Sequence, residues 1–291
     1  MTPPLCGLLV GLCGLALLAG GCREDLGRRL AASAGGRSGR LSEDELARTR
    51  ELFARTLALR PGERLGRLEE DWRELGFELA RLSTGEEETL LALAEAPDRR
   101  EGRGFYAFRP GAPRELVVQA PHALPSDDRH TSALALRLFL GSGAAAAGWS
   151  TVGRRQIDLA RDPDTPFQAF TLAFAEAHPR GLVLQLHGFS PDRRTSAAGR
   201  RAEVILSNAT AGSAPWTREL AGCLRAAGLT VAVYPEEVEE LGASSNIQGQ
   251  VLGRTGHAGF LHVEMSAALR ARLVEEEDPG LLAGCLPERV P

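Results

Sequence analysis

The spacing of hydrophobic and polar positions changes several times along the chain. Residues 5–19 form an almost unbroken apolar run, which is shorter than the roughly 20 residues of a membrane span and typical of the core of an export signal. Residues 23–41 are rich in Gly, Arg, Ser and Ala and show no apolar period. We therefore interpret residues 1–22 as a signal segment and 23–41 as a flexible tether.

A helical period begins after the tether. Ser42 to Glu45 has the arrangement of a capping box and predicts a helix that runs to about Leu59. Pro61 opens a second predicted helix to about Leu82, because apolar residues between them recur at roughly helical spacing. Residues 42–84 are thus expected to be a helical segment that packs on the domain that follows.

From residue 85 onward, short apolar runs alternate with longer amphipathic ones. Such alternation predicts one α/β domain over 85–291, with a mainly parallel mixed sheet and helices on both of its faces. The expected strands are 90–94, 104–109, 116–120, 182–187, 203–206, 230–234 and 260–264. The expected helices are 131–140, 166–176, 216–227 and 267–276.

The apolar run near the start ends in Ala19-Gly-Gly-Cys22, which resembles a bacterial lipobox. The resemblance implies lipidation of Cys22 and a protein of the cell envelope, anchored by lipid and facing the periplasm. An ordinary cleaved signal or a short anchor is the alternative. In an oxidising compartment Cys223 and Cys285 could pair, or they could remain two small buried thiols.

Charge excludes several classes of function. The chain has 34 basic and 38 acidic side chains, a net charge of −4, and therefore no broad cationic surface for nucleic acid. Every basic residue is Arg and no Lys is present, which excludes Schiff-base chemistry, the P-loop lysine and the ATP-binding lysine of kinases. The expected partner is a small-molecule or peptide-like substrate, and contact with a membrane is expected only through the lipid anchor.

Three predicted strands end in ionisable side chains: His122, His187 and Glu264. In α/β sheets, functional groups gather at the carboxyl ends of the strands. Buried ionisable groups are costly unless they are paired or bind a metal, and two imidazoles with one carboxylate form a usual ligand set of catalytic zinc. We therefore expect a Zn²⁺ site there, with Glu264 as the base that accepts a proton from water.

Four strings carry a family resemblance: Ala-Pro-His122, the run from Ile157 to Pro163, Gln-Leu-His187-Gly-Phe and His262-Val-Glu264. Their order resembles that of zinc carboxypeptidase-like hydrolases, especially the N-formylglutamate amidohydrolase and poly-gamma-glutamate hydrolase branches. The resemblance implies the fold of that family over roughly residues 85–272.

The same resemblance implies a zinc ion held by His122, an acidic residue downstream and His187, with Glu264 as general base. Position 125, where carboxypeptidases carry their acidic ligand, is Pro. Asp128 is our preferred acidic ligand and Asp127 the alternative.

Arginines and amides complete the predicted site. The resemblance implies that Arg161 binds a substrate carboxylate, although Ala160 stands where that family has Asn. Arg155 is our candidate for oxyanion stabilisation, because a guanidinium grips oxygen anions with two donors; the alternative is a solvated loop with internal ion pairs. Asn246 and Gln248, in a polar segment bounded by glycines, are candidates for binding a peptide-like substrate, and a plain turn explains them equally well.

The sequence therefore predicts an exported zinc hydrolase that cleaves an amide or peptide bond in a small acidic or peptide-like substrate. One rival hypothesis is an envelope lipoprotein that uses the same fold as a non-catalytic binding or structural module. Another is a serine hydrolase that uses Ser150 or Ser207.

Overall fold

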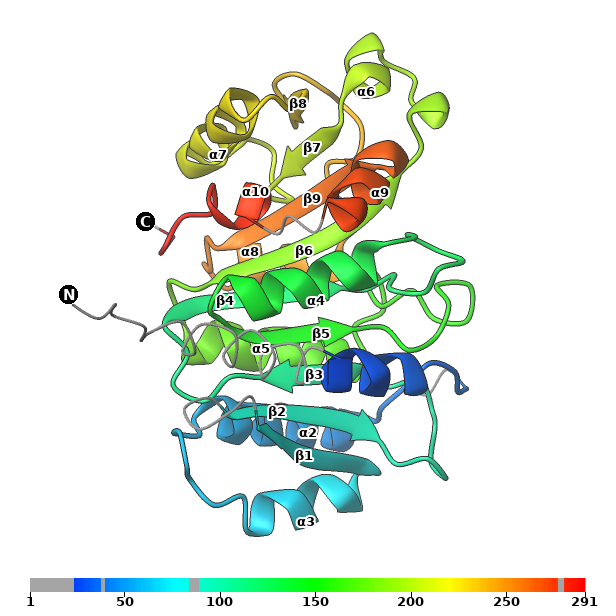
Figure 1. Ribbon diagram of the computed structural model, residues 1–291, viewed down its shortest axis with the longest axis vertical. Coiled ribbons are helices and arrows are strands. Elements are labelled where there is room, and N and C mark those ends of the chain that lie inside the picture. Colours follow the sequence, from blue (N-terminus) through cyan, green and yellow to red (C-terminus); the bar gives the residue numbers. More distant parts are fainter. Residues whose placement is uncertain (1–23, 38–39, 84–88, 277–279, 291) are drawn as a thin grey trace, which may run out of the picture.

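Nine strands form one mixed sheet in the computed structural model, which describes residues 24–37, 40–83, 89–276 and 280–290 (Figure 1). Their order across the sheet is β1-β2-β3-β5-β4-β6-β9-β7-β8. Pairing is parallel between β5, β4, β6 and β9 and between β7 and β8, and antiparallel from β1 to β5 and between β9 and β7. The strands are β1 (Phe77–Ser83), β2 (Thr89–Glu95), β3 (Phe105–Phe108), β4 (Arg114–Ala120), β5 (Ala144–Trp149), β6 (Leu182–Phe189), β7 (Val204–Ser207), β8 (Val231–Val233) and β9 (Phe260–Ser266).

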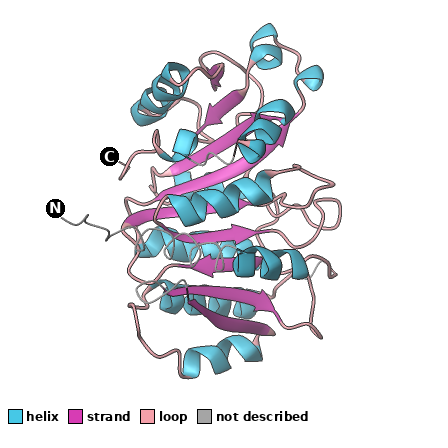
Figure 2. Ribbon diagram, in the orientation of Figure 1, coloured by secondary structure: helices cyan, strands magenta, loops and turns pink. Residues whose placement is uncertain are grey.

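Helices cover both faces of this sheet (Figure 2), which confirms the predicted fold class. On one face α4, α7, α9 and α10 pack over the first apolar core, and on the other α2, α3, α5 and α8 pack over the second. The helices are α2 (Glu43–Leu57), α3 (Arg67–Glu74), α4 (Thr131–Gly141), α5 (Pro166–Ala177), α6 (Ala197–Arg201), α7 (Pro215–Ala226), α8 (Ile247–Arg254), α9 (Ala267–Glu275) and α10 (Gly280–Ala283), with a 3-10 turn, η1 (Pro191–Arg193).

The central strands β4, β6 and β9 are buried on both faces, as their near-continuous apolar runs predict. Their register aligns the polar residues on one face of the sheet. Gln119 lies opposite Gln185, Gln185 lies opposite His262, and His187 lies opposite Glu264. Because side chains repeat every two residues along a strand, this row of polar groups points toward the same side as α5 and α8.

The second predicted helix, 61–82, is wrong over most of its length. Only α3 is helical there, and Phe77 to Ser83 is strand β1, which pairs antiparallel with β2. Helix α3 ends at Glu74, and Gly76, just after the C-cap Leu75, has a φ of 82° in the left-handed region that glycine tolerates. Since β1 belongs to the sheet, the expected division at residues 84 and 85 falls inside the sheet rather than between two units.

The predicted tether is also corrected. Residues 24–32 are helical, and Leu26 is fully buried in the apolar core beside α4. The arginines of this helix, Arg28 and Arg29, are exposed, and most of the glycines that indicated a tether follow the helix. The signal segment and Cys22 lie outside the described residues. In the part of the chain that the structure describes, no helix combines the length and apolarity needed to cross a membrane.

Strand β5 and the helices α6, α8 and α10 were not predicted. Strand β5 has the sequence Ala-Ala-Ala-Ala-Gly-Trp, and alanine favours helix over strand, so only burial in the sheet explains its conformation. Helix α8 replaces the polar loop expected around Asn246, which caps it by accepting a hydrogen bond from the Gly249 N–H. The alternatives for the two cysteines are resolved: Cys223 in α7 and Cys285 near the C-terminus form a disulfide.

Candidate metal centre and active site

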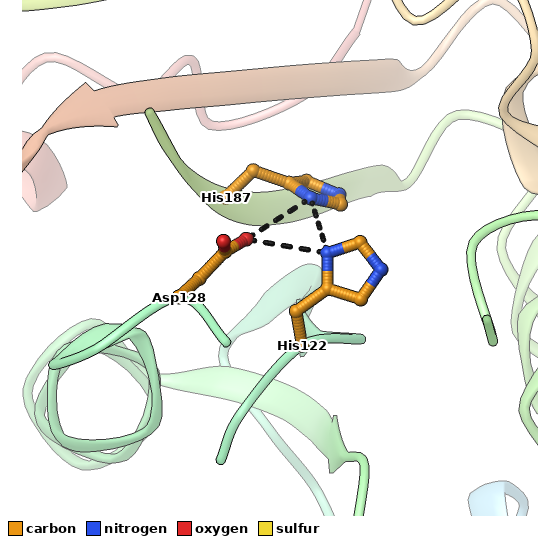
Figure 3. A group of neighbouring side chains, drawn as sticks. All are labelled: His122, Asp128 and His187. Atoms are coloured by element: carbon orange, nitrogen blue, oxygen red, sulfur yellow. Dashed lines mark hydrogen bonds and ion pairs between the residues drawn. The ribbon is translucent and has the colours of Figure 1, made fainter. Parts of the chain in front are cut away.

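Three side chains converge at the carboxyl ends of β4 and β6 (Figure 3). His122 follows β4, His187 lies in β6, and Asp128 lies in the loop before α4. The two imidazole Nδ1 atoms are 3.2 Å apart, and Asp128 Oδ2 lies 3.2 Å from Nδ1 of His122 and 3.6 Å from Nδ1 of His187. All three side chains are less than 10% exposed.

Hydrogen bonds on the far sides of the two rings determine which atoms face one another. His122 Nε2 lies 2.8 Å from Asp158 Oδ1, and His187 Nε2 lies 2.8 Å from Gln185 Oε1. An ionised carboxylate oxygen and an amide oxygen only accept hydrogen bonds, so both Nε2 atoms carry a proton. In the neutral rings, both Nδ1 atoms then present lone pairs toward each other and toward the carboxylate of Asp128.

Three electron-pair donors at such distances fit a shared cation. A tetrahedral ion with bonds of about 2.0–2.1 Å to nitrogen and oxygen places its ligands about 3.4 Å apart, and the three separations are 3.2, 3.2 and 3.6 Å. Without a cation or a proton between them, the lone pairs of His122, Asp128 and His187 would repel each other inside a buried site. These residues are therefore suited to hold a metal ion.

The pKa values of His122, Asp128 and His187 reflect both the burial of the three side chains and the charges of their neighbours. Burial alone would raise the pKa of Asp128, but its contacts with His122 and His187 hold that pKa well below its usual range. Burial likewise opposes the bonds of His122 to Asp128 and Asp158, which nevertheless raise the pKa of His122. Burial lowers the pKa of His187 to about 4. Of the two imidazoles, His122 therefore takes up a proton more readily than His187 in the metal-free protein, and a metal ion that binds there would displace that proton.

Glu264 lies beside this cluster but in a different environment. Its side chain is 10% exposed, and no group among the described residues hydrogen bonds to Oε2. The other oxygen lies 3.8 Å from Nε2 of His262, whose ring stacks on His187 with centroids 4.4 Å apart. Burial, and secondarily the charge of Asp128, raises the pKa of Glu264 to about 8. His187, His262 and Glu264 also lie close enough together to hold an ion.

A cavity of about 870 Å³ opens over His122, Asp128, His187 and Glu264. Six arginines line it: Arg154, Arg155, Arg161, Arg193, Arg194 and Arg270. Arg270 is only 6% exposed and donates from Nε to the Arg129 carbonyl at 2.7 Å and from Nη1 to the Met265 carbonyl. Its guanidinium lies directly against Gly188, where a Cβ atom would overlap it.

The arginines predicted from the sequence lie at the rim of this cavity. Arg155 is exposed and borders the opening. Arg161 is 63% exposed, with Nε 3.8 Å from Asp158 Oδ2. Arg154 donates to the same oxygen at 3.2 Å, and its backbone N–H binds Asp127 Oδ2. Asp127, the alternative acidic ligand, therefore lies outside the cluster, and Asp128 lies inside it.

The two predicted substrate-binding amides are buried. Asn246 borders the cavity but is 4% exposed and donates to Gln185 Oε1. Gln248 is fully buried, does not line the cavity, and donates to the Leu159 carbonyl at 2.8 Å. The structure thus places Gln248 behind the site rather than in it.

Several functional contacts were not anticipated. Asp158 was not among the predicted site residues, because its hydrogen bond with His122 depends on a loop 36 residues away. Gln185 was not among the predicted site residues either, although an amide in an apolar strand signals a buried partner. Nothing in the sequence indicated Arg270. Ser150 Oγ accepts from the Ala123 N–H and Ser207 Oγ donates to the Gly242 carbonyl, so neither hydroxyl is arranged as a nucleophile.

No protein-family model matches the chain, and no curated protein is significantly similar to it in sequence. Solved structures with a similar fold include an N-formylglutamate amidohydrolase from Ralstonia eutropha, with 16% identity and a TM-score of 0.43 over 60% of this chain and 94% of that one. A metallo-carboxypeptidase from Burkholderia cenocepacia has 14% identity and a TM-score of 0.37 over 84% and 69%. An aspartoacylase family protein from Mesorhizobium loti has 13% identity and a TM-score of 0.39 over 72% and 70%. At this level of similarity, function has to be inferred from the residues of the site itself.

Proposed function

We propose that this protein is a zinc-dependent hydrolase that cleaves an amide or peptide bond in a small acidic or peptide-like substrate. The observation that carries the proposal is the convergence of ligand atoms from His122, Asp128 and His187 beside the carboxyl group of Glu264, whose Oε2 has no hydrogen-bond partner among the described residues. Two nitrogens and one oxygen suit Zn²⁺ better than Mg²⁺ or Ca²⁺, which favour oxygen ligands. When bound, the ion supplies Lewis acidity, which polarises a carbonyl group and makes water nucleophilic near neutral pH.

Glu264 is the proposed general base. Its carboxyl group borders the cavity, and Oε2 has no hydrogen-bond donor among the described residues, so a lone pair is free to receive a proton. In the metal-free protein the pKa of Glu264 is about 8, and a bound cation nearby would lower it toward neutral pH, where a general acid and base works best. Glu264 would accept a proton from the attacking water and return it to the leaving nitrogen.

The charge around the opening supports an acidic substrate. Six arginines line the cavity together with four carboxyl groups, those of Asp127, Asp128, Asp158 and Glu264, and the excess of positive charge attracts and orients ligands of the opposite sign. Arg161 remains our candidate for binding a substrate carboxylate and Arg155 for stabilising the oxyanion. Both side chains are exposed at the rim, within reach of a ligand in the cavity.

An exported protein anchored through Cys22 remains part of the proposal. The disulfide between Cys223 and Cys285 supports it, because such bonds persist mainly in oxidising compartments.

Metal content and hydrolysis of purified protein test the function together. We expect about one zinc per wild-type chain, loss of zinc in His122→Ala and in His187→Ala, and retention of zinc with loss of turnover in Glu264→Gln. Substrates to screen are N-acyl amino acids and cell-wall peptides. His257→Ala is a matched control, because His257 is also buried but contacts the His178 carbonyl away from the site.

Stoichiometric zinc in both histidine variants would refute the ligand assignment. Full turnover by Glu264→Gln would refute the assignment of the base. A wild-type protein that binds no zinc would leave the non-catalytic envelope module as the better hypothesis.

A further inference from the structure

Four amide side chains lie together behind His187, on the side away from Asp128. Gln119, Gln185 and Gln248 are fully buried, and Asn246 is 4% exposed. Each amide has one accepting and one donating end, and a buried end without a partner is costly. The partners of these four groups therefore determine which way each amide points.

Helix α8 fixes the first of them. Gln248 contacts the Leu159 carbonyl at 2.8 Å, and a carbonyl only accepts, so the Gln248 atom there is the amide nitrogen. Its oxygen consequently faces Gln185 at 3.3 Å. The Gln185 atom that meets this oxygen must be the donating nitrogen.

Helix α5 leads to the same orientation by a separate route. The Thr171 hydroxyl donates to the Phe167 carbonyl at 2.9 Å, so it has no proton left and accepts from the Gln119 nitrogen at 2.8 Å. The Gln119 oxygen then faces Gln185 at 3.1 Å. This contact again requires the nitrogen of Gln185.

The third route starts at the first turn of α8. The Gly249 N–H donates to the Asn246 oxygen at 3.0 Å, so the Asn246 nitrogen points to the other side and donates to Gln185 Oε1. That same Gln185 oxygen lies 2.8 Å from His187 Nε2. Three independent sets of hydrogen bonds thus hold the Gln185 oxygen against His187.

We propose that Gln185 is a positioning residue for the metal centre: its locked amide oxygen keeps the proton of His187 on Nε2 and leaves the Nδ1 lone pair facing His122 and Asp128. The inference rests on the proposed metal-dependent function and assigns to that site a residue that touches neither metal nor substrate. In the other tautomer, a proton on Nδ1 would occupy the direction in which an ion has to bind.

The cost of turning Gln185 around explains why one orientation persists. A flipped amide would set nitrogen against the nitrogen of Asn246 and the N–H of His187. It would also set oxygen against the oxygens of Gln119 and Gln248. Four favourable contacts would become four unfavourable ones among buried side chains.

The tautomer can be observed directly in the metal-free wild-type protein. In histidine labelled with ¹⁵N, long-range ¹⁵N–¹H correlation spectra at pH 7.5 distinguish a protonated ring nitrogen from a bare one. We expect His187 to be protonated at Nε2 and bare at Nδ1, with assignment by comparison with His187→Ala. A proton on Nδ1, or an even mixture of tautomers, overturns the proposal without any variant of Gln185.

Zinc affinity provides the second measurement, by competition with a chromophoric chelator. Gln185→Met removes the acceptor of His187 at nearly constant volume, and we expect zinc affinity to fall about 10- to 100-fold, the range typical of outer-shell partners of metal ligands. Gln119→Met is the matched control. It replaces an equally buried glutamine on the neighbouring strand. Two of the three sets of hydrogen bonds that orient Gln185 remain, those of Gln248 and Asn246. We expect less than a threefold change from it.

Equal losses of affinity in the two variants overturn the proposal, because a general loss of buried amides would then explain both. Circular dichroism and thermal melting check that each variant folds, and the wild-type spectrum decides the question if Gln185→Met does not. Zinc binding by the wild-type protein distinguishes failure of the proposed function from failure of the role proposed for Gln185. If wild type binds no zinc, the metal centre fails, whereas wild-type zinc binding with unchanged affinity in Gln185→Met removes only the role of Gln185.

Discussion

Replacing Glu264 with Gln should change how the stability of the metal-free protein depends on pH. The unfolded side chain has a pKa near 4.5, and burial raises the pKa in the folded protein to about 8. Between these values the folded state binds one proton more than the unfolded state. The free energy of unfolding therefore falls as pH rises from about 4.5 to 8 and is flat above that. Glutamine cannot titrate, so the variant lacks this fall.

The size of the effect follows from the same two values. At about 1.4 kcal/mol for each pH unit, the interval corresponds to at most about 5 kcal/mol. Near pH 5 wild type and Glu264→Gln should differ by less than about 1 kcal/mol, because a neutral carboxyl group and an amide have nearly the same shape. By pH 8 the variant should be the more stable protein by several kcal/mol.

Urea unfolding at five pH values between 5 and 9, after removal of metal with a chelator, measures this difference. Glu240→Gln is the control. Burial alone would raise the pKa of Glu240, but hydrogen bonds from Ser196 and Thr195 lower it below its usual 4.5. Between pH 5 and 9 the carboxyl group is therefore ionised in the folded and in the unfolded protein. The difference in the free energy of unfolding between Glu240→Gln and wild type should be the same at every pH. A constant offset for Glu264→Gln as well would refute the view that this carboxylate is destabilised by burial.

Two further predictions concern the packing beside the cavity and the disulfide. Gly188→Ala should lower the free energy of unfolding by about 1–3 kcal/mol in a denaturant titration, because the added methyl group overlaps the buried guanidinium of Arg270. Gly222→Ala, on an exposed part of α7 with open space around it, should be neutral or stabilising. Reduction of the disulfide between Cys223 and Cys285 should destabilise the protein by about 4 kcal/mol, given a closed loop of 62 residues. An unchanged melting temperature in reductant would contradict this.

The sequence was sufficient to predict the strands that carry the site. In β4, β6 and β9, apolar runs buried on both faces end in polar residues, and period-two spacing places Gln185 and His187 on one face. The alternation of side chains along each strand determines which of them share a face, and it can be read from the sequence alone. The helix boundary near Gly76 and the strand β5 could not be predicted in the same way. In both places the sequence favours helix, and the conformation is set by pairing with strands elsewhere in the chain.

Contacts between segments that are far apart in the sequence were the part of the site that was hardest to predict. Asp158 reaches His122 from a loop, and Gln248 reaches Gln185 from a helix where a loop was expected. Such partners depend on the order of strands across the sheet, which places β4 next to β6 and leaves α8 over the same face. A single sequence does not specify that order, although buried polar residues in apolar strands do predict that partners exist.

The two carboxyl groups at this sheet edge show how the fold can assign different roles to similar side chains. Asp128 faces two imidazoles, and its pKa is held low. Glu264 lies in the same cavity without a hydrogen-bond donor among the described residues at Oε2, and its pKa is raised to about 8. A carboxylate that stays ionised is suited to hold a cation, and one that titrates near neutral pH is suited to exchange protons. The divergence between these environments supports Asp128 as the ligand and Glu264 as the base, and not the reverse assignment.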